Sequence, residues 1–530
     1  MKLTTAGLYG LCLCLAATLT GCGSASNSSE KAEIIDGGTF TLGLSSDPGS
    51  LDPQMGAGSG LFTVTQFAYD ALLSTDEKSG EIRTALAKTW EVKGNIVSLT
   101  LTPGITCADG TKLTAGAVAD NLNFITEPKN QSPFLGTFFP PGAKTVGDDS
   151  AGTVTITLAQ PAPFILKGLS GLPIICPGGL TERASLKSAT AGTGPYKLSE
   201  AAPGDHYTYS IREGYTWGPG GATTATKGLP KTVVIKVVQN ESTAANLLLS
   251  GGLNAAQIAG PDAERLEKAG LFSADTPGLV GEQWYNHRAG RVTEDPQVRL
   301  ALTKALDLAQ LQKVLTSGQG GPATTLASNE PVACRGDSIS RSVPARNPQA
   351  SASLLDEAGW KAGPDGVRVK NGKPLSLNFL HQNNNGSGGD AAAELAVQQW
   401  KAVGVQATAR SQDETTLTGT LFGAGDWDVA WVSLNVSTPD QLIPFLSGPA
   451  APAGNNFAAI ADPDYDKAVR VAMTTQGTTG CQSWLDAEAG LVAKGALVPF
   501  ASKPVRTFGK AAEFQVPGQL VPTSIRMLAK

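Results

Sequence analysis

The sequence has few of the residues, and none of the short motifs, on which common enzyme mechanisms depend. It contains only three histidines, His206, His287 and His381, and no two of them lie close together in the chain. The His-Glu-x-x-His, Gly-x-Ser-x-Gly and Gly-x-x-x-x-Gly-Lys-Ser/Thr motifs are absent. This argues against a zinc protease, a serine hydrolase of that type and a phosphate-binding loop. Asp and Glu residues are plentiful, so the sequence does not exclude a pair of catalytic carboxylates as in a glycosidase. Surface charge is the more ordinary role for each of these residues.

The sequence also lacks a basic tract and, after its first 21 residues, any apolar run long enough to cross a bilayer. Its net charge is −5, which argues against nucleic acid as a partner. No Cys-x-x-Cys pair and no histidine cluster is present, so the sequence gives no reason to expect a metal or another cofactor. At 530 residues, 41% of them hydrophobic, the chain is too long for one hydrophobic core, and we expect two or three lobes.

A short apolar segment near the N-terminus predicts export from the cytoplasm. Lys2 supplies a positive start, and residues 6–19 are almost entirely apolar but too few for a comfortable transmembrane helix. We therefore expect a cleaved signal over residues 1–21. The segment ends in Leu19-Thr20-Gly21-Cys22, which resembles the lipobox of bacterial lipoproteins. The resemblance implies that Cys22 becomes an acylated N-terminus and that residues 22–32 form a flexible tether; an ordinary signal with a cysteine at its cleavage site is the alternative.

Cysteine usage indicates an oxidising compartment. Seven cysteines are encoded; Cys12 and Cys14 fall within the expected signal, and Cys22 is the expected lipid site. The remainder is even, which in an exported protein predicts two disulfides. The four remaining residues are Cys107, Cys176, Cys334 and Cys481. Three pairings are open on the sequence alone.

Alternating apolar residues and helical spacing together predict a mixed α/β protein. The predicted strands cover residues 40–44, 97–101, 154–158, 233–237 and 375–379. One helix should open at the N-cap Asp295 and continue through apolar positions to Ala309. Two more should cover residues 348–358 and 390–403, because a glycine follows each of them as a helix stop. The stretch 383–389 is rich in Asn and Gly, and we expect it to be an exposed loop.

Five segments, taken in chain order, resemble one protein family. They are residues 38–43 with the turn Leu51-Asp52-Pro53, residues 108–115, Gly192-Thr193-Gly194-Pro195-Tyr196, residues 295–307 and residues 350–360. Each segment is weak alone, but together they span nearly all of the chain behind the lipobox-like signal. On these segments the chain resembles family 5 of the extracytoplasmic solute-binding proteins, the peptide- and nickel-binding components of ABC importers.

The resemblance implies an α/β, three-lobed periplasmic-binding-protein-like fold of type II. Ligand would be buried by hinge closure in a cleft between lobe I and lobe III. The implied ranges are 33–78, 190–278 and 500–530 for lobe I, 79–189 for lobe II and 279–499 for lobe III. These ranges favour the disulfides Cys107–Cys176 and Cys334–Cys481, because each pair then closes within one lobe.

The sequence departs from the family at the segment expected to hold a peptide. Peptide binders of this family commonly carry a Trp, and then an Asp that pairs with the peptide's α-ammonium. By spacing from Asp428, those positions are Leu434 and Ser437. A buried ammonium without a carboxylate is costly. Either another acid, such as the nearby Asp440, supplies the charge, or the ligand has no free α-amine.

The candidate ligand-binding residues lie mainly on one predicted strand and the loop after it. Alternation along a strand would place Trp431, Ser433 and Asn435 on one face, where Trp431 could stack on a planar ligand and the others could hydrogen-bond it. A core position for Trp431 is an equally good interpretation. If Trp431 contacts the ligand, Trp431→Ala should weaken binding more than it lowers the melting temperature. The full candidate set is Trp431, Ser433, Asn435, Ser437, Asp440, Asn286 and Met55.

The resemblance implies a receptor, not an enzyme. We expect a monomer that is lipid-anchored to the cell membrane and faces the extracytoplasmic side. It would capture a peptide or peptide-like solute and deliver it to an ABC permease. The alternatives are a receptor of the same family for nickel, a nickel chelate or another small solute, and a secreted hydrolase.

Overall fold

The structure is a computed structural model that describes residues 33–529 except 57, 77–78, 424 and 476. The expected signal over 1–21, the tether over 22–32 and the lipid site Cys22 lie outside the described residues. Within the described part of the chain, no helix is both long and apolar enough to cross a membrane.

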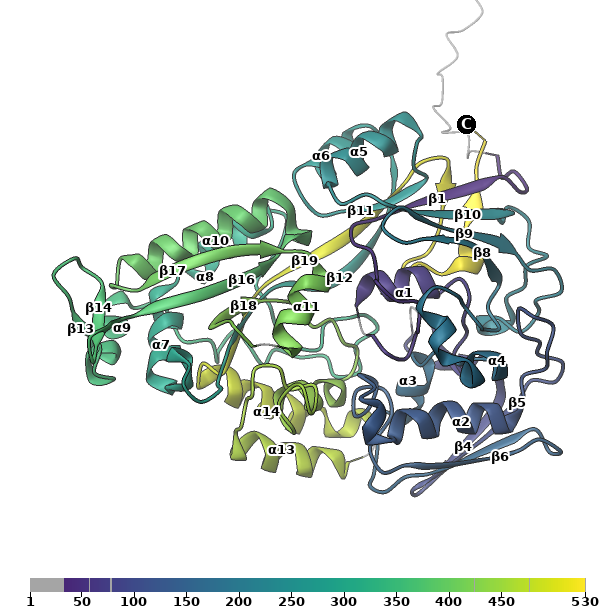
Figure 1. The fold of residues 1–530 in the computed structure, drawn as a ribbon, viewed down its shortest axis with the longest axis horizontal. Helices are drawn as coiled ribbons and strands as arrows, with labels where there is room; N and C mark the ends of the chain where they lie inside the picture. The colour runs from purple at the N-terminus through teal and green to yellow at the C-terminus, as the bar shows by residue number, and fades with distance from the viewer. Residues whose placement is uncertain (1–32, 57, 77–78, 424, 476, 530) are drawn as a thin grey trace, which may run out of the picture. The chain divides into compact units, whose positions relative to one another are not determined.

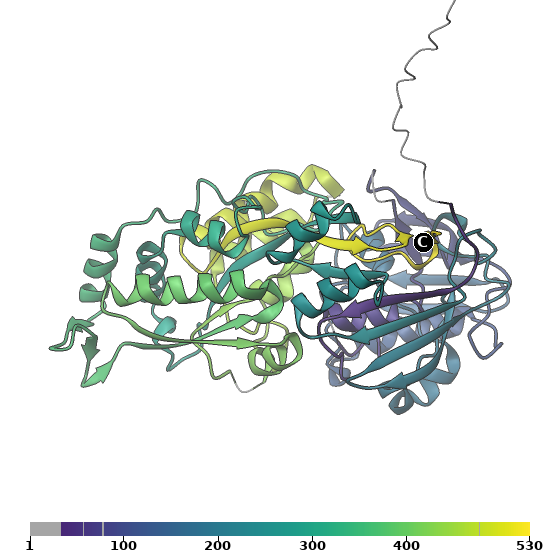
Figure 2. The ribbon, with the colours of Figure 1, turned by 90° about the horizontal axis from the view of Figure 1, so that it is seen from above.

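A ten-stranded mixed sheet is the central element of the fold (Figure 1). Its long strands β12 and β19 pair antiparallel from Phe272–Gly509 to Trp284–Leu497, with register shifts between Leu279 and Gly281 and between Gly281 and Glu282. β19, drawn in yellow, lies between β12 and β11 in the middle of this sheet (Figures 1 and 2). In order across the sheet, the strands are β17 (Gln406–Gln412), β16 (Ser376–Gln382), β18 (Val429–Trp431), β12 (Phe272–Tyr285), β19 (Leu497–Gly509), β11 (Ala255–Ile258), β1 (Thr39–Leu44), β10 (Thr232–Val237), β9 (His206–Ile211) and β8 (Tyr196–Ala202).

A separate four-stranded antiparallel sheet lies within residues 87–157. Its strands, in order, are β4 (Ala87–Lys93), β5 (Ile96–Leu101), β7 (Thr153–Thr157) and β6 (Lys144–Asp148). Helix α2 (Ala115–Thr126) covers it, and Val97, Leu99, Val154 and Ile156 pack in the same buried cluster as the apolar face of α2. The predicted strands over 97–101 and 154–158 are therefore confirmed, and so is their buried face.

Helices cover both faces of the large sheet where β12, β16, β18 and β19 lie. One buried cluster joins Tyr285, Phe379 and Val498 to α7–α10. The other joins Trp284, Leu380 and Leu497 to α11–α14. Neighbouring residues of a strand thus enter different clusters, as strand alternation requires. The bounds are α7 (Pro296–Ala305), α8 (Leu308–Leu315), α9 (Pro348–Glu357), α10 (Gly386–Lys401), α11 (Glu414–Phe422), α12 (Ile443–Leu446), α13 (Pro463–Met473) and α14 (Cys481–Ala493).

The other elements are short, and their strands form three further small sheets, β13-β14-β15, β2-β3 and β20-β21. The helices are α1 (Ser59–Thr65), α3 (Ile165–Ser170), α4 (Pro177–Thr181), α5 (Glu241–Ser250) and α6 (Asp262–Lys268). The strands are β2 (Leu73–Thr75), β3 (Ile82–Thr84), β13 (Lys361–Ala362), β14 (Arg368–Lys370), β15 (Lys373–Pro374), β20 (Ala512–Glu513) and β21 (Arg526–Met527).

The predicted helix beyond Asp295 is confirmed at its start and wrong at its end. Asp295 caps α7 by accepting a hydrogen bond from the Gln297 amide. The helix ends at Ala305, because Leu306 takes an extended conformation and Asp307 caps a second helix, α8, through the Gln310 amide. A second N-cap within one apolar pattern therefore divides it into two helices.

The stretch 383–389, expected as an exposed loop, is instead a short 3-10 turn followed by the start of α10. Gly388 and Gly389 are buried. A Cβ atom on Gly388 would come within 2.9 Å of the Leu315 carbonyl oxygen at the end of α8. Glycine here serves close helix packing, which in the sequence looks the same as a flexible loop. The predicted helices over 348–358 and 390–403 are present, and the stop glycines Gly359 and Gly404 have positive φ angles.

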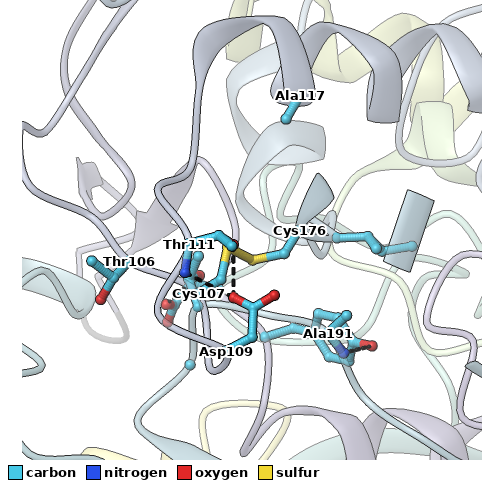
Figure 3. Close-up of a disulfide and its surroundings, with 12 residues drawn as sticks. Thr106, Cys107, Asp109, Thr111, Ala117, Cys176 and Ala191 are labelled. Carbon is cyan, nitrogen blue, oxygen red and sulfur yellow. Dashed lines mark hydrogen bonds between the residues drawn. A yellow bond between two sulfur atoms is a disulfide. The ribbon is translucent and has the colours of Figure 1, made fainter. Parts of the chain in front are cut away.

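Both disulfides are present with the pairing that the lobe ranges favoured. Cys107 is bonded to Cys176, and Cys334 to Cys481. Figure 3 shows Cys107 beside a turn in which Asp109 accepts hydrogen bonds from the amide and hydroxyl of Thr111, at 2.9 and 2.6 Å. The Cys176 amide donates to the Ala191 carbonyl at 2.8 Å. The first disulfide therefore joins this turn to the segment that leads into Gly192-Thr193-Gly194.

The Gly192–Tyr196 segment packs directly on the backbone at Ala68. The Gly194 amide donates to the Ala68 carbonyl at 2.9 Å, and a Cβ atom on Gly194 would lie 2.4 Å from the Ala68 carbonyl carbon. The hydroxyl of Thr193 donates to the buried carboxylate of Asp70 at 2.8 Å. Both glycines of this motif are needed because two backbone segments touch here.

Lobe I, lobe II and lobe III denote the predicted ranges 33–78 with 190–278 and 500–530, 79–189, and 279–499. Their boundaries stay a prediction.

Candidate functional site

Trp431 lies in the core beneath the predicted binding loop. It is only 5% exposed, and its ring lies 5.0 Å from those of both Phe379 and Phe500. Its Nε1 donates to Oε1 of Gln283 at 3.0 Å. It belongs to the cluster on the α7–α10 side of the sheet. Its role in the structure is to support the strand from which the loop emerges.

The loop after β18 leaves strand geometry immediately. β18 ends at Trp431, so Ser433 and Asn435 lie in the irregular segment 432–438 beyond the strand and not on the strand itself. Val432 and Leu434 pack against the cluster on the α11–α14 side, whereas Trp431 packs on the opposite side. Ser433 is half-buried at the start of this loop.

Asn435 attaches the loop to β12. Its Oδ1 accepts hydrogen bonds from the Leu279 amide at 2.8 Å and the Ser328 hydroxyl at 3.1 Å. Its Nδ2 donates to the Leu279 carbonyl at 3.3 Å. These contacts lie beside the register shifts between β12 and β19. The structure therefore gives the amide of Asn435 a bracing role at the point where the long strands are irregular.

Ser437 and Asp440 lie at the turn that closes the loop. Oε1 of Gln441 accepts from the Ser437 amide at 3.0 Å and the Thr438 amide at 3.2 Å. The Ser437 carbonyl accepts from the Ala333 amide at 2.9 Å. Burial raises the pKa of Asp440 to about 6, partly offset by its hydrogen bond to Thr438. Ser437, the position predicted to replace the aspartate of peptide binders, therefore has backbone groups that are already paired.

Asn286 and Met55 occupy contrasting positions. The Asn286 side chain is fully buried and donates to the carbonyls of Gly425 and Trp427 at 3.2 and 2.9 Å. It therefore stabilises the approach to β18. Met55 in lobe I is 44% exposed, in the segment just before α1, and of the two it is the one accessible to a solute.

Glu282 is a buried acid directly behind the loop and is not among the residues predicted from the sequence. Its Oε2 accepts from the Leu434 amide at 2.9 Å. Within the described residues, Oε1 has no hydrogen-bond partner. Burial raises the pKa of Glu282 to about 8 and that of Glu488, which accepts from Ser338, to about 7. Glu282 is an isolated acid on a strand, and nothing in the sequence signals that it is buried.

Lobe I and lobe III meet beside this loop through α1 and α11. The carboxylate of Glu414, the first residue of α11, accepts from the amide and the hydroxyl of Ser59 at 2.8 and 2.9 Å. It also accepts from the Gly60 amide at 3.4 Å. The two helices are drawn side by side in Figure 1. Sequence reasoning missed this pair because 355 residues separate its members.

A cavity of about 340 Å³ lies elsewhere, within lobe III. Its lining includes His287, Arg299, Asp462 and Lys494. Asp462 and Lys494 pair with each other at 2.8 Å, and the guanidinium of Arg299 donates to the carbonyls of Thr293 and Glu294. These side chains are engaged in holding the fold. As for metals, the described residues contain no group of three His, Cys, Asp or Glu side chains placed to hold an ion.

Comparison with known proteins identifies the family. Residues 81–453 match the family model for bacterial extracellular solute-binding proteins, family 5. The chain belongs to this family. Members are solute-binding receptors of ABC transporters and not enzymes. Among curated relatives, Protein XP55 of Streptomyces lividans is 28% identical over 87% of this chain and 83% of its own. The glutathione-binding protein GsiB of Escherichia coli K12 is 27% identical over 68% of this chain and 67% of its own.

Solved family 5 structures have the same fold. A substrate-binding protein from Microbacterium hydrocarbonoxydans, complexed with 4-hydroxybenzoate hydrazide, superposes with a TM-score of 0.80. The two chains are 26% identical, and the match covers 92% of this chain and 99% of the other. The oligopeptide-binding protein AppA of Bacillus subtilis, in complex with a nonapeptide, also gives 0.80 at 19% identity, over 94% of this chain and all of its own. The expected α/β solute-binding fold is confirmed.

Proposed function

We propose that this family 5 protein is a lipid-anchored receptor that captures a peptide or peptide-like solute between lobes I and III and delivers it to an ABC permease. One observation carries the proposal: 92% of the chain superposes on a solute-binding protein that holds an acyl hydrazide. The curated relatives include glutathione-binding and probable peptide-binding proteins. Capture by closure requires contacts that are available only when the lobes meet.

The ligand that best suits the loop has amide-like groups and no free α-ammonium. Ser437 stands at the position of the ammonium-binding aspartate, and its amide is already bonded to Gln441. Glu282, behind the loop, has a raised pKa that keeps it largely protonated at neutral pH. Asp440, with a pKa of about 6, is largely ionised there, but its Oδ1 is buried, so an unblocked ammonium would have to leave water to reach it. A ligand without an ammonium avoids this cost. An N-blocked peptide or an acyl hydrazide meets this condition.

The solute-facing part of the loop would then be Ser433, and the exposed Met55 of lobe I would be a second contact. Four further candidates would not contact the solute but would hold the loop in place, because they are buried or hydrogen-bonded within the fold. They are Trp431, Asn435, Asn286 and Asp440.

Thermal-shift measurements with matched ligands test this proposal. The probes are trialanine, N-acetyl-trialanine, glutathione and 4-hydroxybenzoate hydrazide, with the nickel–histidine complex as the probe for the alternative. We expect a saturable rise in melting temperature with the N-acetylated peptide or the hydrazide and a smaller rise with trialanine. A larger rise with trialanine would contradict the ligand class, and a response to the nickel complex alone would favour the alternative. Native mass spectrometry of protein isolated from its own bacterium would identify a retained solute directly.

The anchor is tested separately from the ligand. Cys22→Ser removes the acceptor thiol, so the protein should appear in the medium or the soluble extracytoplasmic fraction. Cys14→Ser, within the expected signal, is the matched control and should stay with the membrane. Equal membrane association of both variants would refute lipidation at Cys22.

A further inference from the structure

The contact between Glu414 and α1 joins two lobes through one carboxylate. Both of its oxygens are used: Oε1 accepts from the Ser59 amide at 2.8 Å, and Oε2 from the Ser59 hydroxyl at 2.9 Å and the Gly60 amide at 3.4 Å. Hydrogen bonds to an ionised acceptor are stronger than neutral ones. The acceptor lies in lobe III and every donor in lobe I, so the contact exists only while the two lobes lie against each other.

Glu414 is free for this contact because its own helix is capped by its neighbour. Asp413 accepts from the Thr416 amide at 3.0 Å and from the Thr416 hydroxyl at 2.7 Å. Substitution of Glu414 therefore leaves the cap of α11 intact.

A second contact lies beside the first and joins the same two lobes. The hydroxyl of Thr415 donates to the Asp47 carbonyl at 3.1 Å and lies 3.5 Å from the Ser46 hydroxyl. The start of α11 thus meets both the end of β1 and the start of α1.

Lobe III also touches lobe II, but through neutral acceptors. Nζ of Lys167 donates to the Pro331 carbonyl at 2.7 Å, and Nδ2 of Asn455 donates to the Pro133 carbonyl at 3.0 Å. In both cases the acceptor is a backbone carbonyl. Among the contacts between lobes named here, the Glu414 contact is the one in which a carboxylate accepts hydrogen bonds from several donors.

We infer that Glu414 is a latch: in the absence of solute it holds lobe III against α1 and so raises the resting population of the closed state. The inference rests on the proposed closure between lobes I and III. Because the apparent dissociation constant of a closing receptor scales inversely with its competent population, the latch also sets ligand affinity. Glu414 itself need not touch the solute.

Two measurements on the ligand-free, full-length mature protein test the latch. Hydrogen exchange of a peptide that begins at or before residue 55 and covers 59–65 reports whether the Ser59 and Gly60 amides lose their acceptor. Small-angle X-ray scattering reports whether the lobes separate. The variants are Glu414→Ala and Glu414→Gln, and Glu394→Ala on the exposed face of α10 is the matched control.

We expect both Glu414 variants to exchange faster over 59–65 and to have a larger radius of gyration than the wild type and the control. Partly exposed contacts of this kind change an equilibrium by about threefold to fivefold. Ser59→Ala removes one donor and should give a smaller change in the same direction. Because Ser59 lies in α1, an effect of this variant cannot come from a folding defect in α11.

The outcomes separate the latch from the function on which it rests. Faster exchange with unchanged scattering would mean that the contact forms but does not hold the lobes, and unchanged exchange would mean that it does not form. Either result would overturn the latch. If N-acetyl-trialanine and 4-hydroxybenzoate hydrazide, at saturating concentration, also leave the scattering of wild type and variants unchanged, closure itself is refuted.

Discussion

The guanidinium of Arg183 is bound in a bidentate manner to the carboxylate of Asp52. The Nε–Oδ2 and Nη2–Oδ1 distances are both 2.8 Å. Asp52 belongs to the Leu51-Asp52-Pro53 turn of lobe I, and Arg183 stacks on the Phe124 ring, 3.5 Å from its centroid. This pair therefore ties the lobe I turn to lobe II.

Asp52→Asn should destabilise the protein by about 3 kcal/mol, because it leaves a largely buried guanidinium without its partner charge. The melting temperature measures the loss. The exposed ion pair between Lys268 and Glu264 supplies the control: Lys268→Gln should leave the melting temperature nearly unchanged. Equal effects of the two substitutions would show that the Arg183 pair is not structural.

Gly194→Ala should lower the melting temperature strongly, since its Cβ atom would lie 2.4 Å from the Ala68 carbonyl carbon and 2.7 Å from the Tyr69 amide nitrogen. Overpacking of this kind typically costs about 1–3 kcal/mol, and here the obstruction is backbone that cannot rotate away. Gly419→Ala on the exposed face of α11 is the control; nothing lies within 4 Å of its new Cβ, and it should be neutral or slightly stabilising. A stable Gly194→Ala protein would mean that these segments can separate.

Trp431→Ala should cost about 3–5 kcal/mol, because the ring is buried between Phe379 and Phe500. The sequence predicted the opposite, namely that this substitution would weaken ligand binding more than it lowers the melting temperature. Trp431→Phe keeps the ring contacts and removes the hydrogen bond to Gln283, so it should cost less. If Trp431→Ala keeps its melting temperature and loses binding of N-acetyl-trialanine, the residue contacts the solute after all.

Stability should fall as the pH rises from 6.5 to 9. Burial raises the pKa of Glu282 from its usual 4.5 to about 8, so the folded state holds a proton that the unfolded state has released. That stabilising contribution is complete below pH 4.5 and is lost as the pH rises through 8. Burial lowers the pKa of His287 to about 4, so its contribution to stability increases with pH. That increase is complete near pH 6.5, the ordinary pKa of histidine, and does not affect the range from 6.5 to 9.

Glu282→Gln should flatten this decline when melting temperatures are measured from pH 6.5 to 9. Glu394→Gln, on the solvent side of α10, should leave it unchanged. An identical decline in Glu282→Gln and wild type would assign the effect to other groups.

Local features of the fold could be predicted from the sequence, whereas contacts between distant segments could not. Strand alternation located β1, β5, β7, β10 and β16, and the cap Asp295 begins its helix through a hydrogen bond from a nearby amide. The glycines at 388 and 389 were misread because close packing and flexibility call for the same residue. The length of β18 was also missed, since the alternation of Trp431 and Ser433 continues after the strand has ended.

The candidate site could be predicted less well than the fold, because its residues are held by contacts between segments far apart in the sequence. The sequence indicated the loop after Trp431 but not that Asn435 would be bound to Leu279, 156 residues away. The burial of Glu282 depends on packing from α11–α14, which no local pattern describes. Glu414 looks like any acidic residue in the first turn of a helix, and only the folded chain brings Ser59 to it.

The position of β19 has a consequence for the order in which the chain can fold. β19 spans Leu497–Gly509, yet it lies between β11 and β12, which are synthesised more than two hundred residues earlier. Until nearly the whole polypeptide has been made, β11 and β12 have no partner between them, and the ten-stranded sheet stays split. Such non-local pairing slows folding. The nascent chain is therefore kept from reaching its final structure until β19 has been made.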